Sequence, residues 1–310
     1  MNKELFLEQL CEAAGKEAVK RNEPMKKHTT FHVGGPADYF VSPEDEQHFL
    51  AAAALCRKEG MPCYIVGNGS NLLVSEEGFR GVMMETGKGL CYIREEEGLL
   101  KAGAGIFLST LAKEALRLSL TGLEWASGIP GTLGGAVVMN AGAYGSEIRD
   151  VLVSVRVLDL DGTVKEISAE ELQLGYRSSI IPSREYIMLE AALRLPSGNR
   201  DEIKAQMEEL AAKRKARQPL EYPSAGSTFK RPAGYFAGKL IEDAGLRGFR
   251  VGDAQVSEKH CGFVINRGQA RADEVMDLCR QVRQRVYDAF GVELELEIKC
   301  LGDFGDREGS

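Results

Sequence analysis

The chain has 310 residues, 44% hydrophobic and 27% charged, which are proportions of a globular protein and exclude a disordered or collagen-like chain. Its formal net charge of −7 argues against general nucleic-acid binding, which needs a basic surface. The longest unbroken apolar run, Phe49 to Cys56, is too short to cross a bilayer, and residues 1–10 carry charges where a signal peptide would be apolar. We therefore expect a cytoplasmic protein with no membrane or nucleic-acid partner.

The seven cysteines form an odd set without a C-x-x-C pair, which argues against a disulfide framework and against a zinc site. His28 and His32 stand at i, i+4 spacing. No acidic residue lies at a useful spacing from them, and the segment has an extended pattern, so we expect no metal. The seven are Cys11, Cys56, Cys63, Cys91, Cys261, Cys279 and Cys300, and we interpret most of them as buried thiols.

Helical periodicity appears near both ends of the chain, and short β-rich runs fill its middle. The predicted helices cover residues 2–19, 44–57, 105–118, 200–217 and 272–290. The predicted strands between residues 62 and 195 include CYIV, GVMMET, KAGAG, the hairpin VLVSVRVLDLDGTVKEIS and YIMLEAALRL. Only one helix interrupts these strands, so the pattern favours an α+β fold over a doubly wound parallel sheet. Near the C-terminus, VELELEIKCLG has the period-2 pattern of a strand with one wetted face.

A break at PSGNRDE ends the last strand of the middle region and precedes a helix. We place a domain boundary there. The expected first domain covers residues 1–197, with one lobe at about 1–60 and a second at about 61–197. A smaller α/β domain follows at 198–303, and residues 304–310 form a tail.

The segment IVGNGSNLLVS leads from an apolar strand into a glycine-containing turn. Gly67 and Gly69 allow successive backbone N–H groups to point at one spot, an arrangement suited to a pyrophosphate, and Ser70 and Asn71 add side-chain donors. Leu72 occupies the third glycine position of a dinucleotide fingerprint, and LLVS has the pattern of a strand, so a Rossmann turn is disfavoured. Taken alone, the loop fits a tight β-turn as well as a phosphate site.

The segment SGIPGTLGGAVVMNAGAYG, residues 127–145, holds six glycines and no acidic side chain, and its pattern is neither that of a helix nor that of an ordinary loop. A flat multi-ring cofactor needs apolar walls and backbone polar groups near its ring edge, and glycines allow that approach. The alternative is a tightly packed helix–sheet contact. Two such loops in a β-rich domain without a Rossmann turn favour a flavin held by loops.

Several motifs together resemble the UDP-N-acetylenolpyruvoylglucosamine reductase family over roughly residues 20–302. They are HTTFHVGGPADYFV, VGNGSNLLVS, SGIPGTLGGAVVMNAGAYG, LGYRSSI, EYPSAGSTFKRP, AGKLIEDAGLRG and LELEIKCLG. The resemblance implies an FAD-binding domain of the vanillyl-alcohol-oxidase (PCMH) type followed by a substrate-binding domain. The short step from Arg177 to Ser227 resembles the family's shorter, type II form.

The resemblance also implies a reaction in peptidoglycan precursor synthesis. NADPH reduces FAD, and UDP-N-acetylglucosamine enolpyruvate is then reduced to UDP-N-acetylmuramate. Separately from the resemblance, we expect a monomer. Arg177 matches the family's enolate-stabilising arginine, whose guanidinium suits a carboxylate. Ser227 matches the proton donor, and Glu297 matches a glutamate that assists enolate formation or orients the group. Without the resemblance, these three would be interpreted as a surface arginine, a turn serine and an exposed strand carboxylate.

Further site residues follow from the two glycine loops and from the resemblance. We assign FAD contacts to Gly67, Asn68, Gly69, Ser70, Asn71, Leu72, Ser127, Gly128, Ile129, Pro130, Gly131, Thr132, Gly135, Asn140, Ala141 and Gly142. We assign substrate contacts to Tyr176, Arg217, Gly226, Arg231, Lys259 and His260. Positive charge for a diphosphate gathers between residues 213 and 231, where six basic side chains face only Glu221: Lys213, Arg214, Lys215, Arg217, Lys230 and Arg231.

Two other functions remain open. An FAD-dependent sugar or alcohol oxidase would share the flavin domain but would lack the SAGSTF and LELEIK pair. A non-catalytic nucleotide-sugar or flavin-binding module would not bring Arg177, Ser227 and Glu297 into one neighbourhood.

Overall fold

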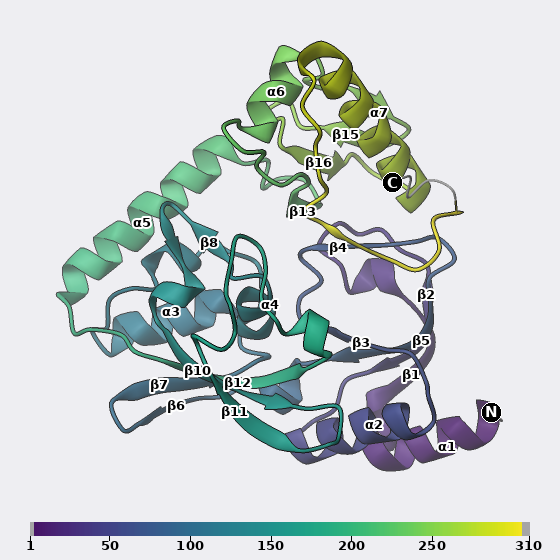
Figure 1. Cartoon of the computed structure of the whole chain (residues 1–310), viewed down its shortest axis with the longest axis vertical. Helices are drawn as coiled ribbons and strands as arrows, with labels where there is room; N and C mark the ends of the chain where they lie inside the picture. The colour runs from purple at the N-terminus through teal and green to yellow at the C-terminus, as the bar shows by residue number, and fades with distance from the viewer. Residues whose placement is uncertain (1–2, 306–310) are drawn as a thin grey trace. The chain divides into compact units, whose positions relative to one another are not determined.

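The computed structural model describes residues 3–305, which fold into two compact units (Figure 1). Unit 1 comprises Met1–Arg21, Tyr39–Gly67 and Gly81–Arg214, and unit 2 comprises Asn22–Asp38, Asn68–Arg80 and Lys215–Ser310. Each unit is therefore built from three stretches of chain. The contiguous division at residue 197 differs from this arrangement, because two early stretches pack with the C-terminal part.

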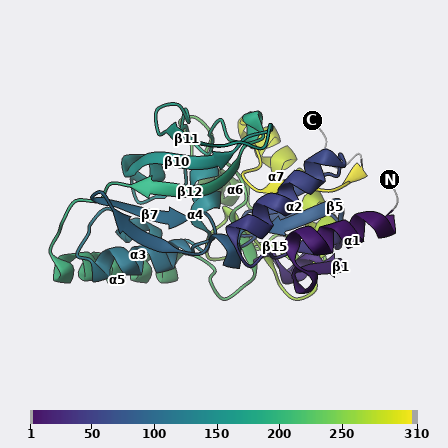
Figure 2. The ribbon, with the colours of Figure 1, turned by 90° about the horizontal axis from the view of Figure 1, so that it is seen from below.

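A four-stranded sheet has the order β1-β2-β5-β3, and β3 and β5 pair in parallel. Helices α1 (Lys3–Ala14) and α2 (Glu46–Lys58) lie side by side (Figures 1 and 2). The Asp45 side chain caps α2 by accepting a hydrogen bond from the His48 N–H at 2.8 Å. The strands are β1 (Val19–Pro24), β2 (Pro36–Val41), β3 (Cys63–Val66) and β5 (Phe79–Glu85).

Unit 1 also contains an antiparallel five-stranded sheet of order β11-β10-β12-β7-β6. Figure 2 shows α3 (Leu108–Arg117) and α5 (Arg200–Arg217) on one side of this sheet. Short α4 (Leu133–Val138) packs against β7 and β12. The strands are β6 (Ile93–Glu96), β7 (Leu99–Gly103), β10 (Leu152–Leu158), β11 (Val164–Ser168) and β12 (Ile187–Leu193), with a separate pair β8 (Gly142–Ala143) and β9 (Ser146–Glu147).

Unit 2 has an antiparallel sheet of order β13-β16-β15-β14 and a parallel pair, β4 with β17. Its core includes one apolar face of α7 (Ala272–Phe290), with Val275, Cys279, Val282 and Val286 at helical spacing. The other elements are β4 (Leu72–Val74), β13 (Ser224–Ser227), α6 (Ala237–Asp243), β14 (Arg250–Val251), β15 (Ala254–Val256), β16 (Phe263–Asn266) and β17 (Lys299–Leu301).

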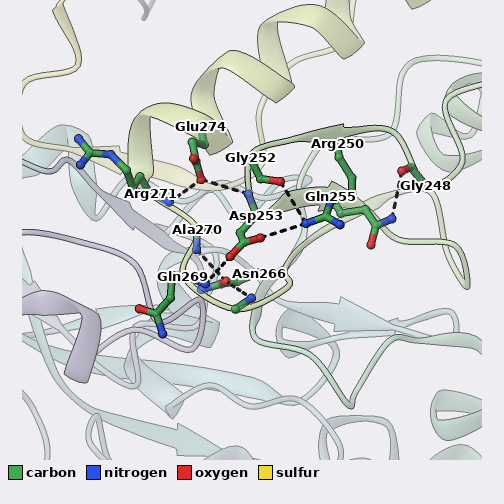
Figure 3. A network of polar contacts seen from close by, with 11 residues as sticks. Gly248, Arg250, Gly252, Asp253, Gln255, Asn266, Gln269, Ala270, Arg271 and Glu274 are labelled. Atoms are coloured by element: carbon green, nitrogen blue, oxygen red, sulfur yellow. Dashed lines mark hydrogen bonds and ion pairs between the residues drawn. The ribbon is translucent and has the colours of Figure 1, made fainter.

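A polar network fixes the start of α7 (Figure 3). The Glu274 carboxylate accepts hydrogen bonds from the Arg271 N–H at 3.0 Å and the Asp253 N–H at 3.3 Å. The Asp253 carboxylate accepts from the Gln269 N–H at 2.9 Å, and Asn266 Oδ1 accepts from the Ala270 N–H at 3.0 Å. These bonds tie the loop before α7 to the turn between β14 and β15.

The predicted helices 200–217 and 272–290 match α5 and α7, and the α+β class is confirmed. Two predictions about strands are wrong. The segment around residues 28–32 forms turns, because His32 has a φ of 56° and its N–H donates to the Thr29 carbonyl. VELELEIKCLG forms a strand only at β17, with one isolated bridge between Leu296 and Phe229, although Leu294 and Ile298 are buried in the core of unit 2 as its period-2 pattern predicts.

All seven cysteines lie within the described residues and are free thiols. Only Cys56, Cys261 and Cys279 are buried, so the interpretation of most of them as buried thiols is wrong. Within residues 3–305, no helix combines the length and the apolar character that a membrane span requires.

Two glycines of unit 2 provide a test of backbone packing. Gly78 and Gly245 have φ values of 75° and 72°. A Cβ on Gly78 would lie 1.8 Å from the Pro36 oxygen, whereas a Cβ on Gly245 would meet nothing within 4 Å. Gly245→Ala should cost about 1–2 kcal/mol for the left-handed backbone, and Gly78→Ala should cost a further 1–3 kcal/mol, roughly the cost of overpacking. Urea unfolding measures the free energy of unfolding of both variants. An equal loss of this free energy in the two variants would contradict the close packing of Gly78.

Candidate active site

The first glycine loop, Asn68 to Leu72, is fixed within unit 2 on two sides. Gly69 packs so closely on the chain that a Cβ there would lie 2.1 Å from the His28 oxygen, and its carbonyl accepts from the Thr30 N–H at 3.3 Å. On the other side, Asn71 Nδ2 donates to the Glu297 carbonyl at 3.2 Å. The loop is therefore held by residues far away in sequence.

This loop presents unused donors. Among residues 3–305, no acceptor takes the backbone N–H groups of Gly69, Ser70 and Asn71, or the Ser70 hydroxyl. Successive free N–H groups suit a phosphate, as the sequence predicts. The Asn71 side chain donates to the protein itself, and the Leu72 side chain is buried. The loop therefore offers mainly backbone and the Ser70 hydroxyl.

Ser227 and Glu297, two of the predicted catalytic residues, lie on neighbouring backbone segments of unit 2. The Glu297 N–H donates to the Thr228 carbonyl at 2.8 Å, and the Lys230 N–H donates to the Glu295 carbonyl at 2.8 Å. Both Ser227 and Glu297 are partly buried. Because the Asn71 side chain donates to the carbonyl of Glu297 itself, the first glycine loop lies next to the segments of Ser227 and Glu297.

Gly226, a predicted substrate contact, explains how the Ser227 backbone is directed. Its φ of 76° is in the left-handed region, and the pairing of β13 with β16 shifts register between Ser224 and Ser227. Such a bulge re-aims the following side chain and is common beside functional sites.

The second glycine segment does contain a helix, so the expectation of no helix between residues 127 and 145 is wrong. Thr132 caps α4, with Oγ1 accepting from the Gly135 N–H at 3.5 Å. A Cβ on Gly134 would lie 3.0 Å from the Ala104 Cβ, and one on Gly67 would lie 2.2 Å from Thr132 Oγ1. Capping and close packing thus outweigh the low helix propensity of glycine.

Gly135 differs from these packed glycines. It is exposed, and a Cβ there would meet only Thr132 Oγ1, at 3.7 Å. Within residues 3–305, the N–H groups of Gly128, Gly131 and Thr132 have no protein acceptor. The segment therefore combines structural glycines with a stretch of accessible backbone at the predicted cofactor positions.

Asn140, a predicted FAD contact, is fully buried, and its side chain is used within the protein. Nδ2 donates to Glu147 Oε2 at 3.0 Å and to the Gly175 carbonyl at 3.1 Å, and Oδ1 accepts from the Arg149 N–H at 3.1 Å. Its N–H also donates to the Val137 carbonyl at 3.1 Å, so these groups of Asn140 are used within the protein and are not available to a cofactor.

Arg177 lies in the tight turn that Asn140 supports. The N–H and carbonyl groups of Gly175 and Ser178 bond reciprocally at 3.0 and 3.3 Å, and Arg177 has a φ of 55°. Its Nη2 donates to the Gly142 carbonyl at 3.4 Å, and its guanidinium lies 5.1 Å from the centroid of the exposed Tyr176 ring. A left-handed non-glycine residue is costly and is often found at functional sites. Arg177 belongs to unit 1, so its proximity to Ser227 and Glu297 stays a prediction.

Several basic residues predicted for the substrate have partners in the protein. Arg231 Nε donates to the Tyr235 carbonyl at 3.3 Å, and its guanidinium lies 3.9 Å from the Phe236 ring centroid. Lys259 Nζ donates to the Lys215 carbonyl at 2.7 Å and lies 3.7 Å from Glu221 Oε2. Arg217 is exposed at the end of α5.

The basic stretch is also less positive than its sequence suggests. Lys213 pairs with Glu209, and Lys230 lies 2.8 Å from Glu295 Oε2. Both acidic partners stand outside residues 213–231.

Arg214 was not among the predicted contacts, although its side chain lies against the second glycine segment. A Cβ on Gly128 would lie 2.6 Å from Arg214 Cδ and 2.8 Å from its Nε. The two residues are distant in sequence, so no local spacing signals this contact. Its only sequence signal is membership of the basic stretch.

His28 does have an acidic neighbour, contrary to the sequence analysis. Its Nε2 lies 3.0 Å from Glu23 Oε1. The same Glu23 oxygen lies 3.5 Å from Lys27 Nζ, and within the described chain no three side chains of the metal-binding types gather at one point.

Comparison with known proteins gives the class and then the family. Residues 37–168 match a family model described as FAD binding domain, and residues 218–301 match one described as UDP-N-acetylenolpyruvoylglucosamine reductase, C-terminal domain. The α+β fold, the backbone donors and the first match define an FAD-dependent oxidoreductase.

The relatives are reductases of one kind. The chain is 52% identical to UDP-N-acetylenolpyruvoylglucosamine reductase of Agathobacter rectalis, over 96% of this chain and 99% of that protein. It is 49% identical to the reductase of Clostridioides difficile, over 97% and 99%. The crystal structure of the Thermus caldophilus reductase superposes with a TM-score of 0.79 at 38% identity, covering 92% of this chain and 99% of that one. This chain belongs to the UDP-N-acetylenolpyruvoylglucosamine reductase family.

His260 gives a test of the local environment. Its Nδ1 accepts from the Gly262 N–H at 3.1 Å, its ring packs edge-on against Phe263, and burial lowers its pKa below the usual 6.5. Folding favours the neutral ring, so its contribution to stability is full above pH 6.5 and falls as the pH drops below that value. We expect NMR titration to place this imidazole below 6.5, with His260→Gln identifying the signal. A midpoint at or above 6.5 would contradict the packing.

Proposed function

We propose that this chain reduces the enolpyruvyl group of UDP-N-acetylglucosamine enolpyruvate to give UDP-N-acetylmuramate, with NADPH as reductant. It would do so as a cytoplasmic monomer of the type II form. Family membership makes it a flavin-dependent reductase of peptidoglycan precursor synthesis, with FAD as cofactor. The observation that carries the proposed roles is the placement of Ser227 and Glu297 on neighbouring segments, beside the loop of free N–H groups.

The residues present fit FAD. The free N–H groups of Gly69, Ser70 and Asn71 suit the cofactor's diphosphate, and the exposed backbone at Gly128 and Gly135 suits close approach of a flat ring. When bound, FAD would supply the hydride chemistry that connects NADPH with the methylene carbon of the enolpyruvyl group. We propose that residues 1–197 bind FAD and residues 198–303 bind the sugar nucleotide, and the family matches at 37–168 and 218–301 support that division.

The three catalytic residues have complementary tasks. Negative charge develops on the substrate carboxylate during reduction, and the Arg177 guanidinium can bind and stabilise it. Ser227 would donate the proton to the carbon next to the methylene group. A serine is a weak acid, so it needs a strongly basic enolate beside it. Glu297, whose backbone is fixed on both sides, would assist enolate formation or orient the group.

The alternatives fit less well. An oxidase of the same fold is not favoured by near-complete matches to reductases. A non-catalytic module gives no reason for Ser227 and Glu297 to share a neighbourhood in unit 2.

Removing the serine hydroxyl should separate the half-reactions. In anaerobic stopped-flow measurements, Ser227→Ala should leave flavin reduction by NADPH unchanged. It should slow reduction of the enolpyruvyl substrate by about 10²- to 10⁴-fold, the usual contribution of a general acid. Ser224→Ala, on the same strand, is the matched control and should preserve both steps. Equal loss in both half-reactions would contradict a proton-donor role.

Gly135 tests whether accessible backbone serves the cofactor. Gly135→Ala has room in the protein and should leave stability unchanged or raise it by about 0.4–1 kcal/mol. If FAD approaches this backbone, its dissociation constant should rise by one to two orders of magnitude, roughly the effect of overpacking. Gly134→Ala, at 3.0 Å from Ala104, should instead lower the unfolding free energy. Unchanged FAD affinity in Gly135→Ala would remove this residue from the cofactor site.

A further inference from the structure

Two thiols of unit 1 lie against each other where α2 meets β3. Cys56 stands in the last turn of α2, and Cys63 is the first residue of β3. A hydrogen bond joins their two side chains. The two sulfur atoms are therefore neighbours, although the catalytic proposal gives neither of them a task.

The chain reverses between the two cysteines through a compact turn. The Met61 N–H donates to the Cys56 carbonyl at 2.8 Å. The Gly60 N–H donates to the Arg57 carbonyl at 3.1 Å, and Gly60 has a φ of 62°. These bonds form a Schellman motif, which fixes the direction in which the chain leaves the helix. Cys63 is held in turn by the parallel pairing of β3 with β5. Hydrogen-bonded backbone thus carries both thiols.

The two thiols differ in their access to solvent. Cys63 is exposed, whereas Cys56 is buried. An accessible thiol beside a second thiol is the arrangement of redox-sensing cysteines, in which the second sulfur resolves the product of the first. The Cys91 thiol is also exposed, but in the described chain no hydrogen bond joins it to another thiol. Cys91 therefore serves as a reference within the same molecule.

The hydrogen bond between the thiols also favours their ionisation as a pair. It lowers the pKa of Cys56 and raises the pKa of Cys63 well above the usual 9.0, because the two sulfurs share the proton that remains. The Arg57 guanidinium opposes the increase at Cys63, so it favours negative charge on the exposed sulfur. Since the thiolate is the reactive form of cysteine, this environment supports exchange chemistry.

We propose that Cys56 and Cys63 are a reversible modification site, which forms a disulfide by exchange with a low-molecular-weight disulfide such as oxidised glutathione. In the first step, the Cys63 sulfur attacks the small disulfide, whose S–S bond breaks, and one small thiol leaves with the Cys63 proton. In the second step, the Cys56 sulfur attacks Cys63 Sγ of the mixed disulfide, and the second small thiol leaves with the Cys56 proton. The protein thiols are oxidised and the small disulfide is reduced. This inference does not depend on the proposed function.

The bond would link the end of α2 to the start of β3. Because the thiols are already in contact, the link needs no rearrangement of the two elements. Cross-linking restricts the unfolded chain, so the oxidised protein should unfold at a higher urea concentration than the reduced protein. Disulfides in reducing compartments are usually transient, and exchange with small thiols makes this one reversible.

Equilibration of the full chain in glutathione buffers, followed by acid quenching and peptide mapping by mass spectrometry, tests the site. The ratio of reduced to oxidised glutathione is kept fixed while the buffer is diluted tenfold. The ratio of oxidised to reduced Cys56–Cys63 pair should then rise about tenfold, because forming the bond releases two glutathione molecules. The mixed disulfide of Cys91 should not change, because its formation releases only one.

Cys56→Ser should stop the exchange at the mixed disulfide of Cys63, which should respond to dilution as Cys91 does. Cys91→Ser is the matched control and should leave the response of the pair unchanged. The proposal fails if the wild-type chain accumulates only mixed disulfide at Cys63, or if the pair stays reduced in the most oxidising buffer. It also fails if oxidation lowers the urea midpoint, because the thiols would then have to leave their native positions to bond. The wild-type measurements decide the question if Cys56→Ser does not fold.

Discussion

The backbone of Glu297 is the constraint on which the candidate site depends. Its N–H donates to the Thr228 carbonyl, and its own carbonyl accepts from Asn71. One residue thereby joins the strand that carries Ser227 to the loop of free N–H groups. Because its N–H and its carbonyl are both used, the direction of its Cα–Cβ bond is set by the fold. Preorganisation of this kind is what catalytic groups require, since reorienting them during reaction would cost free energy.

Thr30 also holds the first glycine loop and β13 together. Its N–H binds the Gly69 carbonyl, its carbonyl accepts from the Ser224 N–H, and its hydroxyl donates to the Ser224 carbonyl at 2.7 Å. The early stretch Asn22–Asp38 is therefore part of unit 2 because it holds both the glycine loop and β13. Local periodicity cannot reveal this, since the bonds between Thr30 and Ser224 join residues 194 positions apart. That is why the contiguous division of the sequence differs from the compact units.

What the sequence predicted well has a local cause. Helices α5 and α7 are long and have continuous helical patterns. The strands of the five-stranded sheet are β-rich runs bounded by turns. The features that the sequence did not predict depend on tertiary contacts. Helix α4 forms in glycine-rich sequence because Thr132 caps it and Gly134 fits against Ala104. For the site, the spacing of glycines singled out the two glycine loops, and the family resemblance singled out Ser227 and Glu297. Neither could show that Gly67 and Gly134 are packed while Gly135 is open, or that the Asn140 amide is used within the protein.

The charge distribution explains how an acidic chain can bind anionic ligands. Net charge governs long-range steering, which salt screens over about 10 Å, whereas binding depends on which cations are unpaired at the site. Lys213 and Lys230 have carboxylate partners within the protein, so counting basic residues between 213 and 231 overstates the positive potential. Arg214 has no such partner in the described chain, and it lies where the backbone adds further donors. Because a half-buried charge interacts through a lower effective dielectric, one unpaired guanidinium there outweighs several paired lysines at the surface.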